Sequence, residues 1–376
     1  MRHTANSPSS STAPRTETSE LAAAGLWEGV DRVLETLSPE TASEQKLGPL
    51  AARRLRLLGR PVPDRLARED RAARAGALVA PALLARIREA YDGPLLLIKG
   101  PELANCYPDG ARRLGDLDVV AADPERAQAA LLSGGFRPKP TNLPADYARH
   151  HHLHPLQYPG LALPVEIHRR VMWPAGLRGP SNEELFEAAV PASVGVDGLL
   201  APDPRHHALL LAAHAWGEVP MRNLREFVDV LALTNDAERG ELRRLAREWD
   251  FEHGWTATLA AADWLLRDGA EPTFVRVWAR HLRSLREPTV LEMHVQKWLS
   301  PFTLASPPVA LRLSATAIVQ DLRPGMSEGW RGKFLRIAHA LPDAFSSRSA
   351  HERRSRERGI RPPRRTVGIG SRRPLD

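Results

Sequence analysis

The segment Asp116-Leu117-Asp118-Val119-Val120 sets two aspartates two positions apart at the head of an apolar run. Another apolar run, Leu95-Leu96-Leu97-Ile98-Lys99-Gly100, ends sixteen residues before the first aspartate. Short apolar runs of this kind predict buried strands. Because alternate side chains of a strand point to the same face, we expect Asp116 and Asp118 to project together.

A third carboxylate follows in Leu163-Pro164-Val165-Glu166-Ile167-His168, whose alternation also predicts a strand. Three carboxylates that converge from two strands form a hard oxygen site suited to Mg²⁺. A lysine and a glycine nearby, Lys99 and Gly100, suit a phosphate group. Each feature alone has an ordinary explanation: a solvated Asp-x-Asp loop, an edge-strand glutamate, or a lysine that reaches into water. Their joint order favours phosphoryl or nucleotidyl transfer.

The composition predicts a protein of the cytoplasm. The chain has 376 residues and a single cysteine, Cys106, which excludes an intramolecular disulfide framework and a multi-cysteine zinc site. The segment 1–20 has no apolar core, so it is not a secretory signal. No stretch reaches the roughly 18 apolar residues that a membrane span requires. We therefore expect no membrane partner.

The net charge of +7 is concentrated in the last residues of the chain. Residues 346–376 contain ten arginines and three acidic residues, a balance of +7, so the remainder is neutral overall. A tail rich in Arg, Pro and Ser predicts a disordered, solvated segment with weak affinity for polyanions. This distribution disfavours a specific nucleic-acid-binding domain.

The patterns along the chain predict an α+β fold with a small mixed sheet and helical additions at both ends. The predicted regions are a disordered N-terminus (1–19), a helical N-terminal region (20–92), an α/β core that carries the carboxylates (93–200), a helical C-terminal domain (201–345) and a disordered basic tail (346–376).

Proline and glycine positions locate several helix ends. Pro81 predicts the start of a new helix that runs to Tyr91. Asp123-Pro124 predicts the start of a helix that ends at Gly134-Gly135. Apolar spacing further predicts one helix over Phe274–Leu285 and buried helices that include Phe334–Leu341.

Four histidines precede the strand that carries the third carboxylate: His150, His151, His152 and His154. On a strand, His152 and His154 would share a face, which is compatible with a transition metal. Without a third ligand, polar strand residues beside the cleft are the favoured interpretation. His168 shares the face of Glu166, and we expect it to support the metal ligands or contact substrate rather than bind the metal.

Several of these segments together resemble a known family. The matching residues are Lys99-Gly100, Leu103, Tyr107, Arg112, Gly115-Asp116-Leu117-Asp118-Val119-Val120, Glu166-Ile167-His168 and Leu224-Arg225-Glu226-Phe227-Val228-Asp229-Val230-Leu231-Ala232. They resemble a family of uncharacterised bacterial nucleotidyltransferases in the polymerase beta-like superfamily, over about residues 78–233.

The resemblance implies that 93–200 is a nucleotidyltransferase core with helical additions. It implies a metal-binding catalytic triad of Asp116, Asp118 and Glu166. Lys99, Gly100 and Arg112 fall at the positions expected to bind the nucleotide.

The phosphate loop departs from the pattern of the wider superfamily, which has Gly-Ser or Gly-Gly where this chain has Gly100-Pro101. Proline has no N–H, so one potential phosphate donor is missing. Lys99, Arg112 or Arg113 could compensate, either arginine could instead pair with a carboxylate of the triad, or the site could be weakened.

The sequence therefore predicts an enzyme that uses Mg²⁺, or Mn²⁺, to move a nucleoside monophosphate from a nucleoside triphosphate to an acceptor. The expected acceptor is a hydroxyl or similar group on a small molecule or peptide. The alternatives are a kinase on the same scaffold, a sugar-nucleotide glycosyltransferase that uses Asp-x-Asp, and a degenerate binding module.

Overall fold

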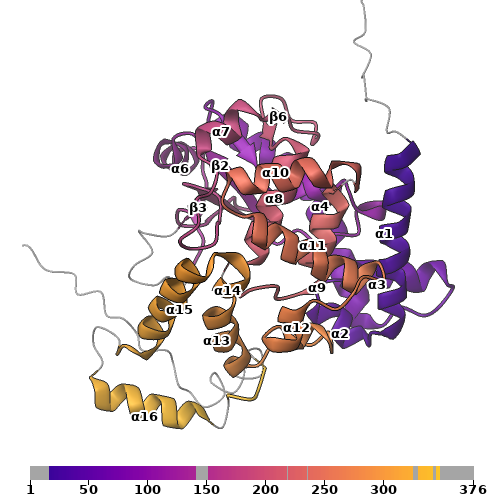
Figure 1. Ribbon diagram of the computed structural model, residues 1–376. Coiled ribbons are helices and arrows are strands. Elements are labelled where there is room, and N and C mark those ends of the chain that lie inside the picture. Colours follow the sequence, from indigo (N-terminus) through magenta and orange to yellow (C-terminus); the bar gives the residue numbers. More distant parts are fainter. Residues whose placement is uncertain are drawn as a thin grey trace, which may run out of the picture.

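The sheet is the centre of the fold, and Figure 1 shows it in the upper half of a computed structural model. The structure describes the following residues: 17–140, 151–217, 219–234, 236–324, 329–341 and 344–347. Most of the two ends predicted to be disordered, 1–19 and 346–376, therefore lies outside the described residues. No helix in the described part is long and apolar enough to span a bilayer.

Seven strands of the described chain form one mixed sheet in the order β3-β4-β5-β2-β1-β7-β6. Their bounds are β1 Leu95–Leu97, β2 Leu117–Ala121, β3 Arg137–Pro138, β4 Leu156–Gln157, β5 Pro164–His168, β6 Val190–Pro191 and β7 Leu200–Ala201. β2 runs parallel to β5, and β1 runs parallel to β7, whereas the other neighbours are antiparallel. The predicted α+β fold with a mixed sheet is confirmed.

The alternation of side chains separates two hydrophobic cores on the two faces of the sheet. Leu117 and Val119 of β2 belong to one core, together with Val165 of β5. Val120 of β2 belongs to the other core, which includes the C-terminal helices. The positions that carry the carboxylates alternate with the first set, so they face the C-terminal helices.

Four helices precede the sheet: α1 Glu17–Thr36, α2 Pro39–Glu44, α3 Gly48–Leu57 and α4 Asp64–Ala90. The predicted helix start at Pro81 is wrong, because α4 is continuous through this residue. Pro81 lies on the exposed side, and Ala77, whose carbonyl loses its N–H partner, is exposed as well. Water can bond that carbonyl, while the buried residues Leu83 and Leu84 hold the next turn in place.

Short helices connect the strands of the core: α5 Pro101–Ala104, α6 Pro124–Ser133 and α7 Asn182–Glu187. α6 begins as predicted, with the Asp123 side chain accepting a hydrogen bond from the backbone N–H of Arg126. It ends at the predicted glycine pair, where Gly135 adopts a left-handed φ of 91°.

The helices after the sheet are α8 Pro204–Ala215, α9 Leu224–Leu233, α10 Arg239–Glu248, α11 Glu252–Leu266, α12 Thr273–Val277, α13 Val290–Leu299, α14 Pro301–Leu304, α15 Pro307–Leu322 and α16 Trp330–Ala340. The single helix predicted over Phe274–Leu285 is wrong, because α12 ends at Val277. Beyond it, the buried ring of His281 bonds the carbonyl of Met221 and the side chain of Gln296. These long-range hydrogen bonds override the local helical pattern.

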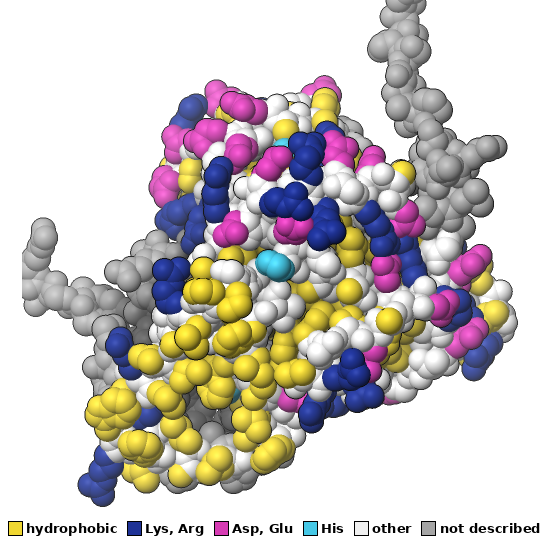
Figure 2. Space-filling model, viewed as in Figure 1, with side chains coloured by type: hydrophobic (Ala, Val, Ile, Leu, Met, Phe, Trp, Pro, Cys, Tyr) yellow, Lys and Arg dark blue, Asp and Glu magenta, His cyan; other side chains and the backbone are white. Residues whose placement is uncertain are grey.

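Buried helices were also predicted to include Phe334–Leu341, and this is wrong for α16 in the described structure. Phe334 is 64% exposed and Leu341 is 60% exposed. Figure 2 shows apolar side chains gathered over the lower part of the molecule, where Figure 1 places α16. A helical period of apolar residues indicates an apolar face, but not whether another element covers it.

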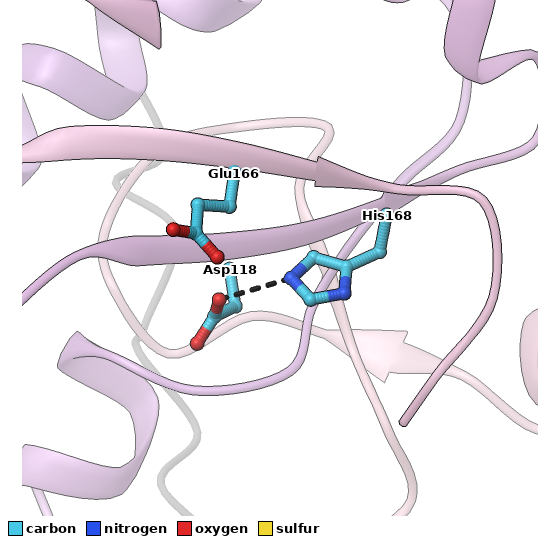
Figure 3. A group of neighbouring side chains, drawn as sticks. All are labelled: Asp118, Glu166 and His168. Atoms are coloured by element: carbon cyan, nitrogen blue, oxygen red, sulfur yellow. Dashed lines mark hydrogen bonds and ion pairs between the residues drawn. The ribbon is translucent and has the colours of Figure 1, made fainter. Parts of the chain in front are cut away.

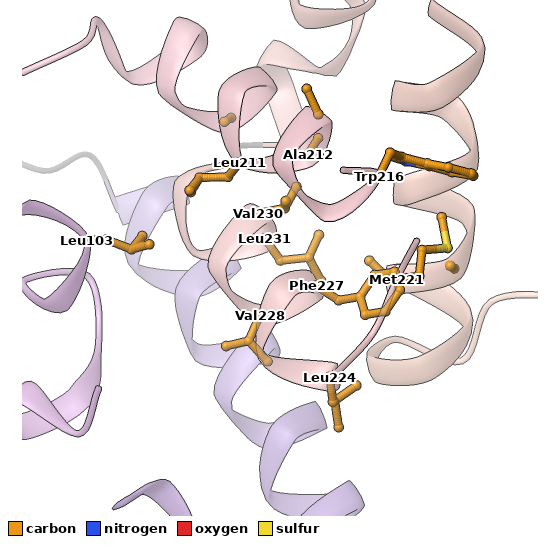
Figure 4. Close-up of a cluster of buried hydrophobic side chains, with 14 of the residues drawn as sticks. Leu103, Leu211, Ala212, Trp216, Met221, Leu224, Phe227, Val228, Val230 and Leu231 are labelled. Atoms are coloured by element: carbon orange, nitrogen blue, oxygen red, sulfur yellow. The ribbon is translucent and has the colours of Figure 1, made fainter. Parts of the chain in front are cut away.

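The larger core lies between the sheet and the C-terminal helices, and Figure 4 shows part of it around α9. Phe227, Val228 and Leu231 of α9 are buried here, and Trp216 closes the end of α8. Leu103 of α5 points into the same cluster from the sheet side (Figure 4). Apolar packing therefore fixes α9 against the core.

A buried ion pair reinforces this junction. Nε and Nη2 of Arg112 donate to the two carboxylate oxygens of Asp229 at 2.8 and 2.9 Å, and the hydroxyl of Tyr107 donates to the same carboxylate. Burial raises the pKa of Asp229, but the arginine and the hydrogen bonds outweigh this effect and keep its pKa below the ordinary value. The pair joins the segment before β2 to α9.

Replacement of Arg112 by leucine should lower the free energy of unfolding by about 3–5 kcal/mol, because it leaves the Asp229 carboxylate buried without its cation. Urea denaturation at pH 7 measures this loss. The matched control is Arg126→Leu, which removes an exposed arginine paired with Asp92 and should cost less than about 1 kcal/mol. An equal effect of the two substitutions would contradict the interpretation.

Candidate active site

Backbone pairing places the second aspartate directly beside the third carboxylate. Asp118 is the register partner of Glu166 in the parallel pairing of β2 with β5. Figure 3 shows the two carboxylates side by side, projecting from adjacent strands. Asp116 precedes the first residue of β2 and continues the alternation toward the same face. The structure thus brings these residues together as the sequence led us to expect, while their roles remain predictions.

Asp118 and Glu166 form a potential cation site with His168. One ligand atom from each side chain lies within 4.8 Å of the other two. Two carboxylate oxygens and an imidazole nitrogen are suitable donors for a divalent cation such as Mn²⁺, and the oxygens also suit Mg²⁺. Asp116 is not part of this close group, although its charge acts on Glu166.

The carboxylate of Asp118 is stabilised in its ionised form. Burial opposes ionisation, but Lys99 and His168 outweigh it and hold the pKa of Asp118 below its ordinary value. Nζ of Lys99 lies 3.8 Å from Oδ2, and Nε2 of His168 lies 3.0 Å from Oδ1. An ionised carboxylate only accepts, so in this hydrogen bond His168 carries a proton on Nε2, which it would have to lose before that nitrogen could bind a cation.

The other two carboxylates ionise less readily. Burial raises the pKa of Asp116, and the neighbouring charge of Asp118 adds to the effect. Burial also raises the pKa of Glu166 to about 7, with further contributions from Asp118 and Asp116. A carboxyl group that titrates near neutral pH can take up or release a proton under physiological conditions.

The histidines before β5 only partly follow the prediction. The strand β4 begins at Leu156, after the histidines, so His152 and His154 do not lie on it. His152 instead forms an isolated bridge with His168, and its Nε2 lies 3.6 Å from Oε2 of Glu166. His151 lines the cavity into which the carboxylates open. His150 lies outside the described residues.

The loop at Gly100 lacks one backbone donor that a phosphate loop usually offers. Gly100 adopts a φ of 78°, and a Cβ atom here would lie 3.2 Å from the side chain of Leu117. Pro101 begins a helix of only four residues and provides no N–H. Its neighbour Glu102 accepts hydrogen bonds from Ser193. Phosphate binding by Gly100 remains a prediction.

Arg112, predicted to bind the nucleotide, has a different main contact in the structure. Its guanidinium is buried and bonds Asp229 through two nitrogens, as described above. The residue still borders the cavity beside the carboxylates. Its observed contacts indicate that it positions α9, and binding of the nucleotide by Arg112 stays a prediction.

The carboxylates open into a cavity of about 700 Å³. Sequence reasoning missed much of its lining, which comes from the turn after α2 and from the start of α9. The missed basic residues are Lys46, Arg65, Arg222 and Arg225. Arg225 stands in the segment Leu224–Ala232 that carried the family resemblance, but nothing in the sequence linked Lys46 to this site.

Comparison with known proteins assigns the chain to a family. A family model described as an uncharacterised nucleotidyltransferase matches residues 39–267. The chain belongs to this family. No curated protein and no solved structure matches the chain.

Membership of the nucleotidyltransferase family makes the protein a transferase of phosphorus-containing groups. The matched residues begin at the first residue of α2 and end one residue after α11. They include the sheet with its carboxylates and Arg225 of α9. The family match thus covers the candidate site except for Glu287, which also lines the cavity.

Replacement of Glu166 by glutamine should stabilise the metal-free protein at pH 8 by about 1–3 kcal/mol. The folded-state pKa of about 7 exceeds the ordinary value of 4.5, so ionised Glu166 destabilises the fold above pH 7. This penalty disappears as pH falls from 7 to 4.5, and the advantage of the variant should disappear with it. Urea denaturation in EDTA at pH 8 and pH 5 measures the difference.

The control is Glu125→Gln, the same chemical change on the exposed first turn of α6. It should show no gain at pH 8. A gain of Glu166→Gln that is equally large at pH 5 would mean that ionisation is not its cause.

Proposed function

We propose that this nucleotidyltransferase moves a nucleoside monophosphate from a nucleoside triphosphate to a hydroxyl or similar acceptor on a small molecule or peptide. The observation that carries the proposal is the register pairing of Asp118 with Glu166 at the edge of a cavity that also contains Lys99. The family supports nucleotidyl transfer in general. The metal, the nucleotide and the acceptor are specific to our proposal.

Asp118 and Glu166, together with Asp116, are the residues that would hold Mg²⁺ or Mn²⁺. A bound divalent cation neutralises phosphate charge and makes the acceptor hydroxyl more acidic. The burial and crowding of three carboxylates on one face support this role, because burial and the neighbouring charges raise the pKa values of Asp116 and Glu166 and a cation would relieve the repulsion.

The reaction forms a bond between the acceptor oxygen and the α-phosphorus and breaks the bond between that phosphorus and the bridging oxygen to the β-phosphate. Pyrophosphate leaves with the bridging oxygen. The acceptor hydroxyl must lose its proton, and the carboxylate of Glu166, whose side chain is 24% exposed, can receive it. Asp118 stays ionised beside Lys99 and His168, so it is not suited to take up this proton.

Replacement of Asp118 by asparagine should lower nucleotide transfer by about 100-fold or more, because it removes a charge that would hold the cation. The assay is a screen of nucleoside triphosphates and acceptors with Mg²⁺ or Mn²⁺, read by pyrophosphate release. The mass of the modified acceptor identifies the group transferred. A nucleotide adduct supports the proposal, whereas a phosphate adduct would make the protein a kinase.

Asp116→Asn is the second test, and Glu125→Gln is the control outside the cavity. Full metal-dependent turnover by either aspartate variant would refute the assignment. Thermal unfolding of each variant establishes that a loss of activity is not a loss of fold.

A further inference from the structure

A group of basic side chains lines the cavity beyond the carboxylates. We call this group the cationic wall, defined as Lys46, Arg113, Arg222 and Arg225. Lys46 lies between α2 and α3, Arg113 lies before β2, and the other two lie at the start of α9. Segments far apart in the sequence thus contribute to one basic surface.

Gln45, which is 1% exposed, joins the segment that carries Lys46 to the start of α9. Its Oε1 accepts from the backbone N–H of Leu224, and its Nε2 donates to the carbonyl of Leu285. Its backbone carbonyl also accepts from the N–H of Arg225. Lys46 follows directly in the sequence, so these bonds fix it beside the start of α9.

The backbone of Lys46 is in an unusual conformation. Its φ is 62°, in the left-handed region that non-glycine residues rarely adopt. Burial lowers the pKa of this lysine, and the charges of Arg225, Arg222 and Arg113 lower it further. The charge of Glu69 partly offsets this repulsion, and Glu226 and Glu287 also line the cavity, so a bound anion would relieve the repulsion that remains among the four cations.

The side chains at the start of α9 have spare capacity for hydrogen bonds. Nε of Arg225 is buried and has no hydrogen-bond partner among the described residues. It lies 4.0 Å from Oδ2 of Asp229, a carboxylate already bonded by Arg112. Nη2 of Arg222 lies 3.7 Å from Oε1 of Glu287, beyond direct hydrogen-bond distance. Donors in this wall are therefore available to a ligand.

One residue of the cationic wall, Arg225, acts electrostatically on the first aspartate. The charge of Arg225 lowers the pKa of Asp116. The charges that act most strongly on Glu166 are instead those of Asp118, Asp116, Lys99 and Lys139.

We propose that the cationic wall binds the β- and γ-phosphates of the nucleoside triphosphate and supplies donors in addition to the loop at Gly100, where Pro101 has no N–H. This inference rests on the proposed function for the identity of the donor substrate. Arginine offers several N–H groups in a planar fork that matches phosphate oxygens, and lysine adds a compact charge. Cations from three segments suit an oligophosphate that carries several negative charges better than a single carboxylate.

The test is calorimetric binding of inorganic pyrophosphate to the full chain at pH 7.5 in EDTA, which removes divalent cations. The variants Lys46→Gln and Arg225→Gln should each weaken binding by about 10-fold, since each removes one charged donor. Lys46→Arg keeps the charge and should stay within about threefold of the wild type. Arg205→Gln is the matched control, because Arg205 pairs with Asp203 and Glu241 outside the cavity.

Wild-type affinity in both Lys46→Gln and Arg225→Gln would overturn the inference, and so would failure of the wild type to bind pyrophosphate. Equal affinity for orthophosphate would exclude a site built for an oligophosphate. Thermal unfolding shows whether the variants are folded.

The variant Asp118→Asn separates this inference from the proposed function. If both hold, it binds pyrophosphate without metal and transfers no nucleotide. If it transfers nucleotide, the proposed catalytic role fails while the binding result for the cationic wall stands.

Discussion

The parallel pairing of β2 with β5 is the constraint on which the candidate site depends. Strands in a sheet lie about 4.8 Å apart, so register partners on one face are forced into proximity. Here the partners are Asp118 and Glu166, whose like charges repel each other. The backbone hydrogen bonds of the ladder hold them together, and Lys99 and His168 offset part of the repulsion. The site therefore combines a rigid frame with unfavourable electrostatics, which is typical of functional positions.

The two faces of the sheet have different roles: one stabilises the fold, and the other carries the ionisable groups of the site. Leu117, Val119 and Val165 bury their side chains on one face and supply apolar packing. The intervening positions of the same strands carry the ionisable groups and face α8 and α9. Because the period of a strand is two residues, a shift of the register by one position would exchange the two sets. The hydrophobic core thus fixes the orientation of the carboxylates.

Local chemistry explains which features could be predicted from the sequence. The strand that carries Asp118 and the Asp123 cap of α6 follow from alternation or capping within a few residues, whereas the pairing of Asp118 with Glu166 was expected only from the joint order of the motifs. Continuity of α4 through Pro81 could not be predicted, because it depends on packing that the local pattern does not contain. The partner of Arg112 lies 117 positions away in the chain, and the cationic wall joins three separate segments. Such contacts exist only in the folded chain.

The hydrogen bonds of Gln45 also bear on when the site can form. Its side chain joins residues 179 and 240 positions further along the chain. Contacts of such long range require large loops to close, and they form late relative to local helices and hairpins. A ribosome-bound chain that has not yet reached Leu285 lacks the acceptor for one of these bonds. The strands of the sheet, among them those that carry the carboxylates, end by Ala201, so they are synthesised before the Leu285 carbonyl that anchors Gln45.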